Sequence, residues 1–338
     1  MFAAGVLAQT PQPLPTREKV LVGVPAKLKQ NAALHLAKEL GEFEKENLEV
    51  EYSFNKPSDS FVLLGTGRID VVASQPSAAF FNAVAAGTEI KYVAPIASLA
   101  PKNGFWVSKA FLNGRPYHPS MLKGQAIAAV QGLGTVTAYV VQKELAKAGL
   151  TLNDISWRAM KPADALVALE NGAVNFALLL DPVWGKADPA KVDYAFDYSN
   201  DVNGGYFFGP NLLVNKRAVG EAFVRALART QRQYLQGNYA DNPRVLAALA
   251  KEMGESEEAI RAAVPGLSFP ADMAVREDMA ELIQQTYLST PGILTYTAPL
   301  PDGKIIDRSF LHAAGVQAKP LPAVKASSVL KKDGGAGK

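Results

Sequence analysis

The sequence repeats itself in Lys56-Pro-Ser-Asp-Ser-Phe-Val-Leu-Leu-Gly-Thr-Gly67 and Lys161-Pro-Ala-Asp-Ala-Leu-Val-Ala-Leu-Glu-Asn-Gly172. The two stretches align without gaps and share Lys, Pro, Asp, Val, Leu and Gly. In each copy a helix-like segment ends at a glycine, and a short apolar run follows at 68–73 or 173–180. Such a match predicts that the chain is built from two similar units.

The elements before the repeat also occur twice. Strand-like runs at 20–24 and 126–130 each lead through a loop into a helix that ends near Gly41 or Gly149. Each unit therefore reads strand, loop, helix, strand, helix, strand. This order predicts two mainly parallel sheets with helices on their faces, and so two α/β lobes.

The last third of the chain is predicted to be mostly helical. Residues 206–215 fit a strand that returns to the first lobe, and helices fit 242–253, 256–264 and 271–289. The longest helix carries an apolar stripe made of Val219, Phe223, Val224, Leu227, Tyr234 and Leu235. These helices are expected to brace the lobes from outside. The small, polar tail at 321–338 is expected to be mobile.

Composition excludes several functions. The 338 residues carry 35 Lys and Arg against 32 Asp and Glu, and no basic block stands out, so nucleic acid is not an expected partner. Cysteine is absent, and the three histidines are scattered without a catalytic or metal-binding motif. We therefore expect no metal, no cofactor and no catalytic residues.

The chain begins with a short apolar run that ends in Val6-Leu-Ala8, a pattern typical of signal-peptidase sites, although a charged region before it is missing. We interpret residues 1–16 as a truncated export leader, with an unstructured N-terminus as the alternative. No apolar run reaches the length that spans a bilayer.

Ligands of parallel sheets bind beyond the carboxyl ends of the strands. The repeat places four loops there, two per lobe, facing one cleft, and a fifth position lies near the first crossing between the lobes. The expected ligand-binding residues are Lys29, Gln30, Asn31, Ser74, Gln75, Pro76, Ser77, Asn103, Gly134, Thr135, Thr137, Asp181 and Trp184. Loops that lead into helices offer free N–H groups to an anionic oxygen.

Several of these residues also have a purely structural interpretation. Thr135 and Thr137 suit helix capping, Asp181 suits capping and Trp184 suits packing. The Gly132-x-Gly134 pair lacks the third glycine and the later acidic residue of a dinucleotide site. Lysines in the loops are more often solvated than ligand-bound.

Several ordered motifs carry a family resemblance. They are the Val22-Gly-Val24 strand, Leu64-Gly-Thr-Gly-Arg-Ile-Asp70, Gly87-Thr-Glu-Ile-Lys-Tyr-Val93, Leu122-Lys-Gly-Gln-Ala-Ile127 and Gly134-Thr135. Over about residues 18–290 the chain resembles the nitrate, sulfonate and taurine substrate-binding proteins of ABC transporters, the NMT1/THI5-like group.

The resemblance implies a type II periplasmic-binding-protein fold, in which two α/β lobes close around a ligand. Lobe I is expected at 17–98 and 208–320 and lobe II at 99–207, with crossings near 97–103 and 203–209. The resemblance further implies an exported, periplasmic and monomeric protein that delivers a small molecule to a membrane permease and its ATPase.

The resemblance leaves the ligand open, because the expected cleft offers mainly neutral donors beside Asp181 and Trp184. A sulfonate, a taurine-like zwitterion, a carboxylate, nitrate or a pyrimidine-like or aromatic compound all remain candidates. A cysteine-independent enzyme on the same fold is the alternative to a binding protein. Its known patterns rely on cysteine, which this chain lacks.

Overall fold

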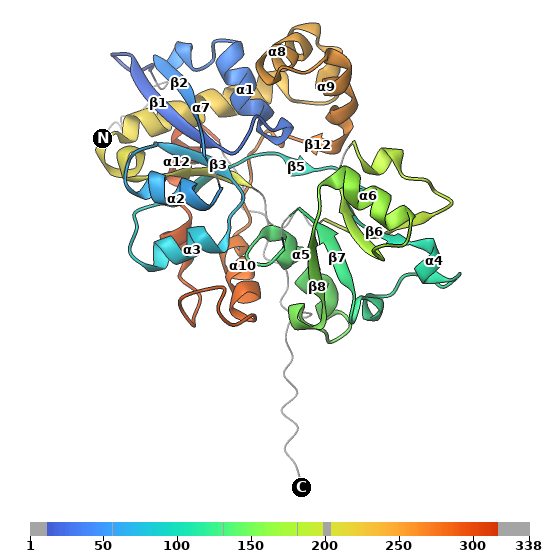
Figure 1. Cartoon of the computed structure of the whole chain (residues 1–338). Coiled ribbons are helices and arrows are strands. Elements are labelled where there is room, and N and C mark those ends of the chain that lie inside the picture. Colours follow the sequence, from blue (N-terminus) through green and yellow to red (C-terminus); the bar gives the residue numbers. More distant parts are fainter. Residues whose placement is uncertain (1–11, 56, 131, 181, 199–203, 317–338) are drawn as a thin grey trace, which may run out of the picture.

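The computed structural model describes residues 12–55, 57–130, 132–180, 182–198 and 204–316 as two lobes (Figure 1). Most of the expected leader, the whole expected tail and Asp181 lie outside these residues.

The first lobe is built on a five-stranded sheet in the order β2-β1-β3-β11-β4. β1 pairs in parallel with β2 and β3, whereas β11 runs antiparallel between β3 and β4. The strands are β1 (Glu18–Val24), β2 (Leu48–Phe54), β3 (Val71–Ser74), β4 (Lys91–Pro95) and β11 (Gly205–Phe208).

The second lobe repeats this topology. Its sheet has the order β10-β6-β9-β7-β8, with β6 as the antiparallel strand beside β9 and β10. The strands are β6 (Gly104–Ser108), β7 (Ala126–Ala129), β8 (Ser156–Ala159), β9 (Phe176–Leu179) and β10 (Val192–Asp197). The order β8-β7-β9-β6-β10, taken from the opposite edge, matches β2-β1-β3-β11-β4 of the first lobe strand by strand. In both sheets the fourth position is held by an antiparallel strand, β6 or β11. The predicted duplication is therefore confirmed.

The repeated stretches form equivalent helices. α2 (Pro57–Gly65) and α6 (Pro162–Glu170) each begin at the proline of their copy and precede the third strand of their lobe. Proline suits the first turn of a helix, where its missing N–H has no partner to lose. The other helices of the two units are α1 (Ala32–Glu39), α3 (Ala78–Ala85), α4 (Lys109–Leu112) and α5 (Val136–Ala146).

Two crossings join the lobes. The first contains β5 (Ser98–Leu99), which pairs with β12 (Leu267–Ser268). The second ends at Gly204, because residues 205–208 already pair with β3 and β4. The expected crossing at 203–209 and the boundary at 207/208 were therefore placed a few residues too late.

The predicted strand over 206–215 is also too long. β11 ends at Phe208, and Asn211–Asn215 form a π-helical turn after Pro210. The Asn211 amide donates to the carbonyl oxygen of Gly67 at 3.0 Å and to Asp70 Oδ1 at 2.8 Å, which turns the chain away from the sheet.

The C-terminal helices cover the first lobe. The residues of the predicted stripe of α7 (Arg217–Tyr234) and Leu235 after it are buried. α10 begins at Met279 rather than at residue 271, because Met273 adopts a left-handed φ of 45°. The remaining helices are α8 (Pro243–Met253), α9 (Glu257–Ala263), α10 (Met279–Leu288), α11 (Asp302–Ile305) and α12 (Ser309–Ala313).

Most of the buried apolar side chains form one core that extends through both lobes, and a smaller one lies under α6. α10 packs against α5 of the second lobe, as Figure 1 shows. In the described ranges, every helix is too short or too polar to cross a membrane.

Candidate functional site

Two of the four predicted loops meet across the lobes. The backbone N–H of Ala78, at the start of α3, donates to the carbonyl oxygen of Gly134 at 3.0 Å. Gly134 has a φ of 77°, a conformation that glycine adopts without strain. The loop 74–77 of the first lobe therefore lies against the loop before α5 of the second.

The loop between β1 and α1 is held by a buried histidine. His35 Nε2 lies 3.2 Å from the carbonyl oxygen of Leu28, and Nδ1 lies 3.0 Å from the hydroxyl of Tyr52. Burial, together with Lys27 and Lys38, lowers the pKa of His35 to about 4, although its bond to Leu28 acts in the opposite direction. A neutral ring fits this geometry, because Nε2–H then donates to the carbonyl and Nδ1 accepts from the hydroxyl. This role of His35 was not predicted, because its partner Tyr52 lies 17 residues away on β2.

The lysines of the same loop are paired with C-terminal carboxylates. Lys27 Nζ lies 3.0 Å from Glu252 Oε1, and Lys29 Nζ lies 2.6 Å from Glu255 Oε2. Lys29 and Gln30 nevertheless line a cavity of about 270 Å³ together with Asn103 and Leu180. Lys29 therefore lines a cavity, with its charge balanced by Glu255.

Asn31 is fully buried, and neither polar atom of its side-chain amide has a hydrogen-bond partner among the described residues. It occupies the N-cap position of α1 without capping the helix. Buried amides are almost always paired, so an unpaired one indicates a missing partner.

Asn103 provides the contrast. It is also buried, but its amide donates to the carbonyl oxygens of Ala100 at 3.0 Å and Gly266 at 3.3 Å. These bonds tie the first crossing to the segment before β12. The predicted ligand residue Asn103 thus has a structural task in this conformation.

The loop after β3 lies beside the second crossing. Ser74 pairs with Gly205 of β11, and the Gln75 amide nitrogen lies close to Gly204. The Pro76 carbonyl oxygen accepts from the Tyr287 hydroxyl at 3.3 Å. Ser77 is the N-cap residue of α3, and its side chain makes no capping bond.

The threonines of the second lobe bond within the protein. Thr135 Oγ1 donates to the carbonyl oxygen of Gly132 at 2.6 Å, which leaves the first turn of α5 without a side-chain cap. Thr137 is buried and hydrogen-bonds with Tyr198. Neither residue is the capping group that the purely structural interpretation required.

Trp184 lies in a short aromatic cluster of the second lobe. Its ring stacks on Trp106 at 6.0 Å between centroids, and Lys102 Nζ lies 5.4 Å from the ring centroid. The indole N–H of Trp184 is buried without a partner in the described part of the chain, as is the hydroxyl of Tyr206 on β11. Tyr206 was not predicted; burial raises its pKa above the usual range of tyrosine, although the Leu34 backbone beside it acts in the opposite direction.

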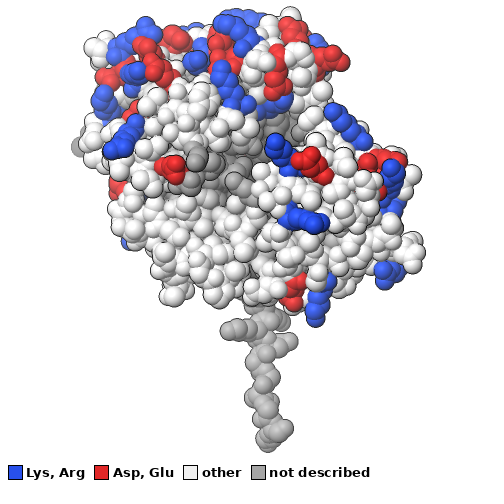
Figure 2. Space-filling view, viewed as in Figure 1, with Lys and Arg blue, Asp and Glu red and all other residues white. Residues whose placement is uncertain are grey.

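Figure 2 shows a hollow between the lobes. Charged side chains gather over the end of the first lobe that carries α1, α7 and α8, and fewer lie below the hollow. Lys27 and Lys29 are paired, whereas Lys102, whose Nζ lies over the Trp184 ring, forms no ion pair within 4 Å with a carboxylate of the described residues. The side of the second lobe that carries Trp184 thus presents the exposed ammonium of Lys102.

The two sheets and the cleft between them define a protein of the type II periplasmic-binding-protein fold. A family model described as NMT1/THI5 like matches residues 29–236, more than half of the chain. The protein belongs to this family.

Solved structures share the fold at low sequence identity. The alkanesulfonate-binding protein SsuA from Xanthomonas axonopodis pv. citri, bound to MOPS, is 18% identical with a TM-score of 0.62, covering 87% of this chain and 100% of its own. The periplasmic nitrate-binding protein NrtA from Synechocystis PCC 6803 is 13% identical with a TM-score of 0.64, covering 88% of each chain.

An enzyme has the same fold. The desulfurization enzyme DSZB is 12% identical with a TM-score of 0.56, covering 88% of this chain and 99% of its own. No curated protein sequence matches the chain significantly.

Proposed function

We propose that this protein is the solute-binding component of an ABC importer. It captures a small organic anion or zwitterion between its lobes and delivers it to a membrane permease and its ATPase. The ligand is a sulfonate, a taurine-like compound, a carboxylate or nitrate. Membership of the NMT1/THI5-like family and the fold shared with sulfonate- and nitrate-binding proteins support this proposal. The proposal includes export to the periplasm and action as a monomer.

The observation that carries the proposal is the unpaired amide of Asn31. A buried amide without partners costs about 1–3 kcal/mol, which a ligand that supplies both a donor and an acceptor removes. Asn31 is the N-cap residue of α1, and the Ala32 N–H beside it already donates to the Lys29 carbonyl oxygen, so the side-chain amide is the group left for a ligand. In this function the ligand bonds to Asn31, and Lys102 and Trp184 contact its remaining charge and apolar part.

Binding rather than turnover is the expected activity. The fold also serves an enzyme, so a bound compound must be recovered chemically unchanged to support a binding protein. A pyrimidine-like or aromatic ligand is the alternative within the same class of protein.

A thermal-shift panel tests the proposal, using taurine, alkyl and aromatic sulfonates, nitrate, carboxylates and pyrimidines. A ligand at about 100 times its Kd stabilises the folded state by about 2.7 kcal/mol, which gives a clear shift in Tm. For the compound that binds, Asn31→Leu should weaken the affinity about tenfold, the equivalent of one lost hydrogen bond.

Asn171→Leu is the matched control, because Asn171 is exposed at the end of α6. Its affinity should equal that of the wild type. Equal affinity of Asn31→Leu and wild type would contradict the site. Conversion of the ligand during incubation would favour the enzyme.

A further inference from the structure

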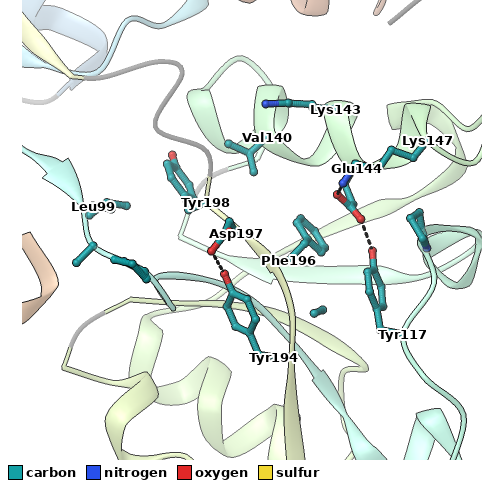
Figure 3. A pocket seen from close by; sticks show the side chains of 14 residues that line it. Leu99, Tyr117, Val140, Lys143, Glu144, Lys147, Tyr194, Phe196, Asp197 and Tyr198 are labelled. Carbon is teal, nitrogen blue, oxygen red and sulfur yellow. Dashed lines mark hydrogen bonds and ion pairs between the residues drawn. The ribbon is translucent and has the colours of Figure 1, made fainter. Parts of the chain in front are cut away.

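A cavity of about 790 Å³ lies beside the first crossing, outside the residues of the predicted site (Figure 3). It is nearly three times as large as the cavity that Lys29 and Asn103 line. Four parts of the chain enclose it: the first crossing at 99–101, the loop at 117–119, α5 and the residues 194–198 of β10 and after it. Volumes of this size hold small molecules in other proteins.

The charged groups of the cavity are already paired. Glu144 is buried, and its carboxylate accepts from Lys147 at 2.5 Å and from the Tyr117 hydroxyl at 3.3 Å. The Tyr194 hydroxyl donates to Asp197, as Figure 3 shows, and Lys143 also has a partner. The lining residues comprise two cations and two anions, so a charged ligand meets no uncompensated opposite charge.

Aromatic rings supply much of the remaining wall. Tyr117 stacks on Phe196 at 5.8 Å, and the rings of Tyr194 and Tyr198 border the same space. Rings of this kind favour offset or edge-to-face packing with another aromatic ring. Together with the balanced charges, they favour a planar aromatic ligand that carries no net charge.

Three walls of the cavity belong to the second lobe, and the fourth is the first crossing between the lobes. Leu99 pairs with Leu267 of β12, and the Ala100 N–H donates to the Gly266 carbonyl oxygen at 3.0 Å, so the crossing is attached to the segment after α9. α5 and β10 belong to the second lobe. Leu99 also lines the smaller cavity beside Lys29, so one residue forms a wall of both.

We propose that this hinge cavity is a second ligand site, which takes a small uncharged aromatic molecule and whose occupancy is coupled to the separation of the lobes. A molecule that fills the cavity opposes any movement of the crossing toward α5. Because coupling between two sites is reciprocal, a ligand in the cleft then changes the affinity of the hinge cavity by the same factor. This site goes beyond the proposed transport function and does not depend on it.

Indole tests the site, with indole-3-acetate and tryptamine as charged analogues, measured by calorimetry and ligand-observed NMR. Val140→Phe and Ala195→Leu each fill the cavity from a different wall and should weaken indole binding at least tenfold. Val167→Phe is the control, because Val167 is exposed on α6. If Val140→Phe does not fold, the indole affinity of Ala195→Leu tests the site.

Indole binding that the filled variants leave unchanged, or an absence of indole binding to the wild type, would overturn the site. An analogue with a net charge that binds as tightly as indole would overturn the assignment of an uncharged ligand.

The coupling has its own test, because the chain contains no cysteine to compete for labels. Spin labels at Val62→Cys and Val167→Cys, exposed and equivalent in the two repeats, report the distance between the lobes. Saturating indole should shift that distance distribution. An unchanged distribution would overturn the coupling and leave the binding result intact.

Discussion

The backbone N–H of Ala78 in one lobe donates to the carbonyl oxygen of Gly134 in the other, at 3.0 Å. Ala78 is the first residue of α3, so its N–H has no partner within the helix. This single bond joins two predicted ligand loops and contributes to the contact between the lobes.

Ala78→Pro removes this bond and little else. Proline suits the first helical position, and the preceding Ser77 has extended backbone angles that tolerate it. We expect a larger mean separation of the lobes and a free energy of unfolding that falls by no more than about 1 kcal/mol, the contact energy of the lost bond. Urea unfolding and solution scattering measure the two quantities. Ala78→Ser, which keeps the N–H, is the control, and identical scattering from both variants would contradict the prediction.

Two buried asparagines should respond in opposite ways. Asn103→Leu leaves the carbonyl oxygens of Ala100 and Gly266 without their donor, so we expect a loss of about 1–3 kcal/mol of stability. Asn31→Leu removes an amide that has no partner among the residues the structure describes, so the ligand-free protein should be as stable as the wild type or more stable. Denaturant unfolding of both variants checks this, and a larger loss for Asn31→Leu would disprove it.

His35 should make stability depend on pH. Its pKa is about 4 in the folded protein and about 6.5 when unfolded, so between these values the unfolded chain binds the extra proton. Its contribution is complete above pH 6.5, falls as the pH decreases and is lost below pH 4, a total of about 3 kcal/mol.

Unfolding free energies between pH 7 and pH 4 test this contribution. His35→Leu should be less stable at pH 7 but lose less stability on acidification than the wild type. His312→Leu, at an exposed position in α12, should keep the slope of the wild type. A slope for His35→Leu equal to that of the wild type would refute the assignment.

Gly205 should tolerate no side chain. A Cβ there would lie 2.1 Å from Cε2 of the fully buried Tyr92 ring. We expect Gly205→Ala to cost about 2 kcal/mol or more, because the surrounding strands leave the ring no room to move. Gly303→Ala, whose Cβ meets nothing within 4 Å, should be neutral. Urea midpoints compare the two, and equal midpoints would argue against a packed contact at Gly205.

The sequence predicted those helices whose pattern depends on residues close together in the chain. The proline and glycine that bound each repeat predicted α2 and α6, and the apolar stripe predicted α7, because helix periodicity depends on neighbours in the chain. The short β11 and the late start of α10 were not predictable in this way. Their limits depend on Asn211 reaching Gly67 and on the left-handed Met273.

The same difference between local signals and distant contacts applies to the candidate site. Loop positions followed from the repeat, and Lys29, Gln30 and Asn103 do line one cavity. The partners that decide what each side chain does lie far away in sequence, as Glu255 does for Lys29. Periodicity contains no information on such pairs, so the unpaired state of Asn31 became visible only in three dimensions.

The antiparallel strand in the middle of the first sheet affects the order in which a ribosome can complete this protein. β3 and β4 are joined only through β11, which emerges after the entire second lobe has been synthesised. Until then the nascent first lobe exposes two unpaired strand edges, the feature that promotes wrong association between chains. Its sheet closes late in translation, so a chain that stops before residue 205 leaves that lobe open.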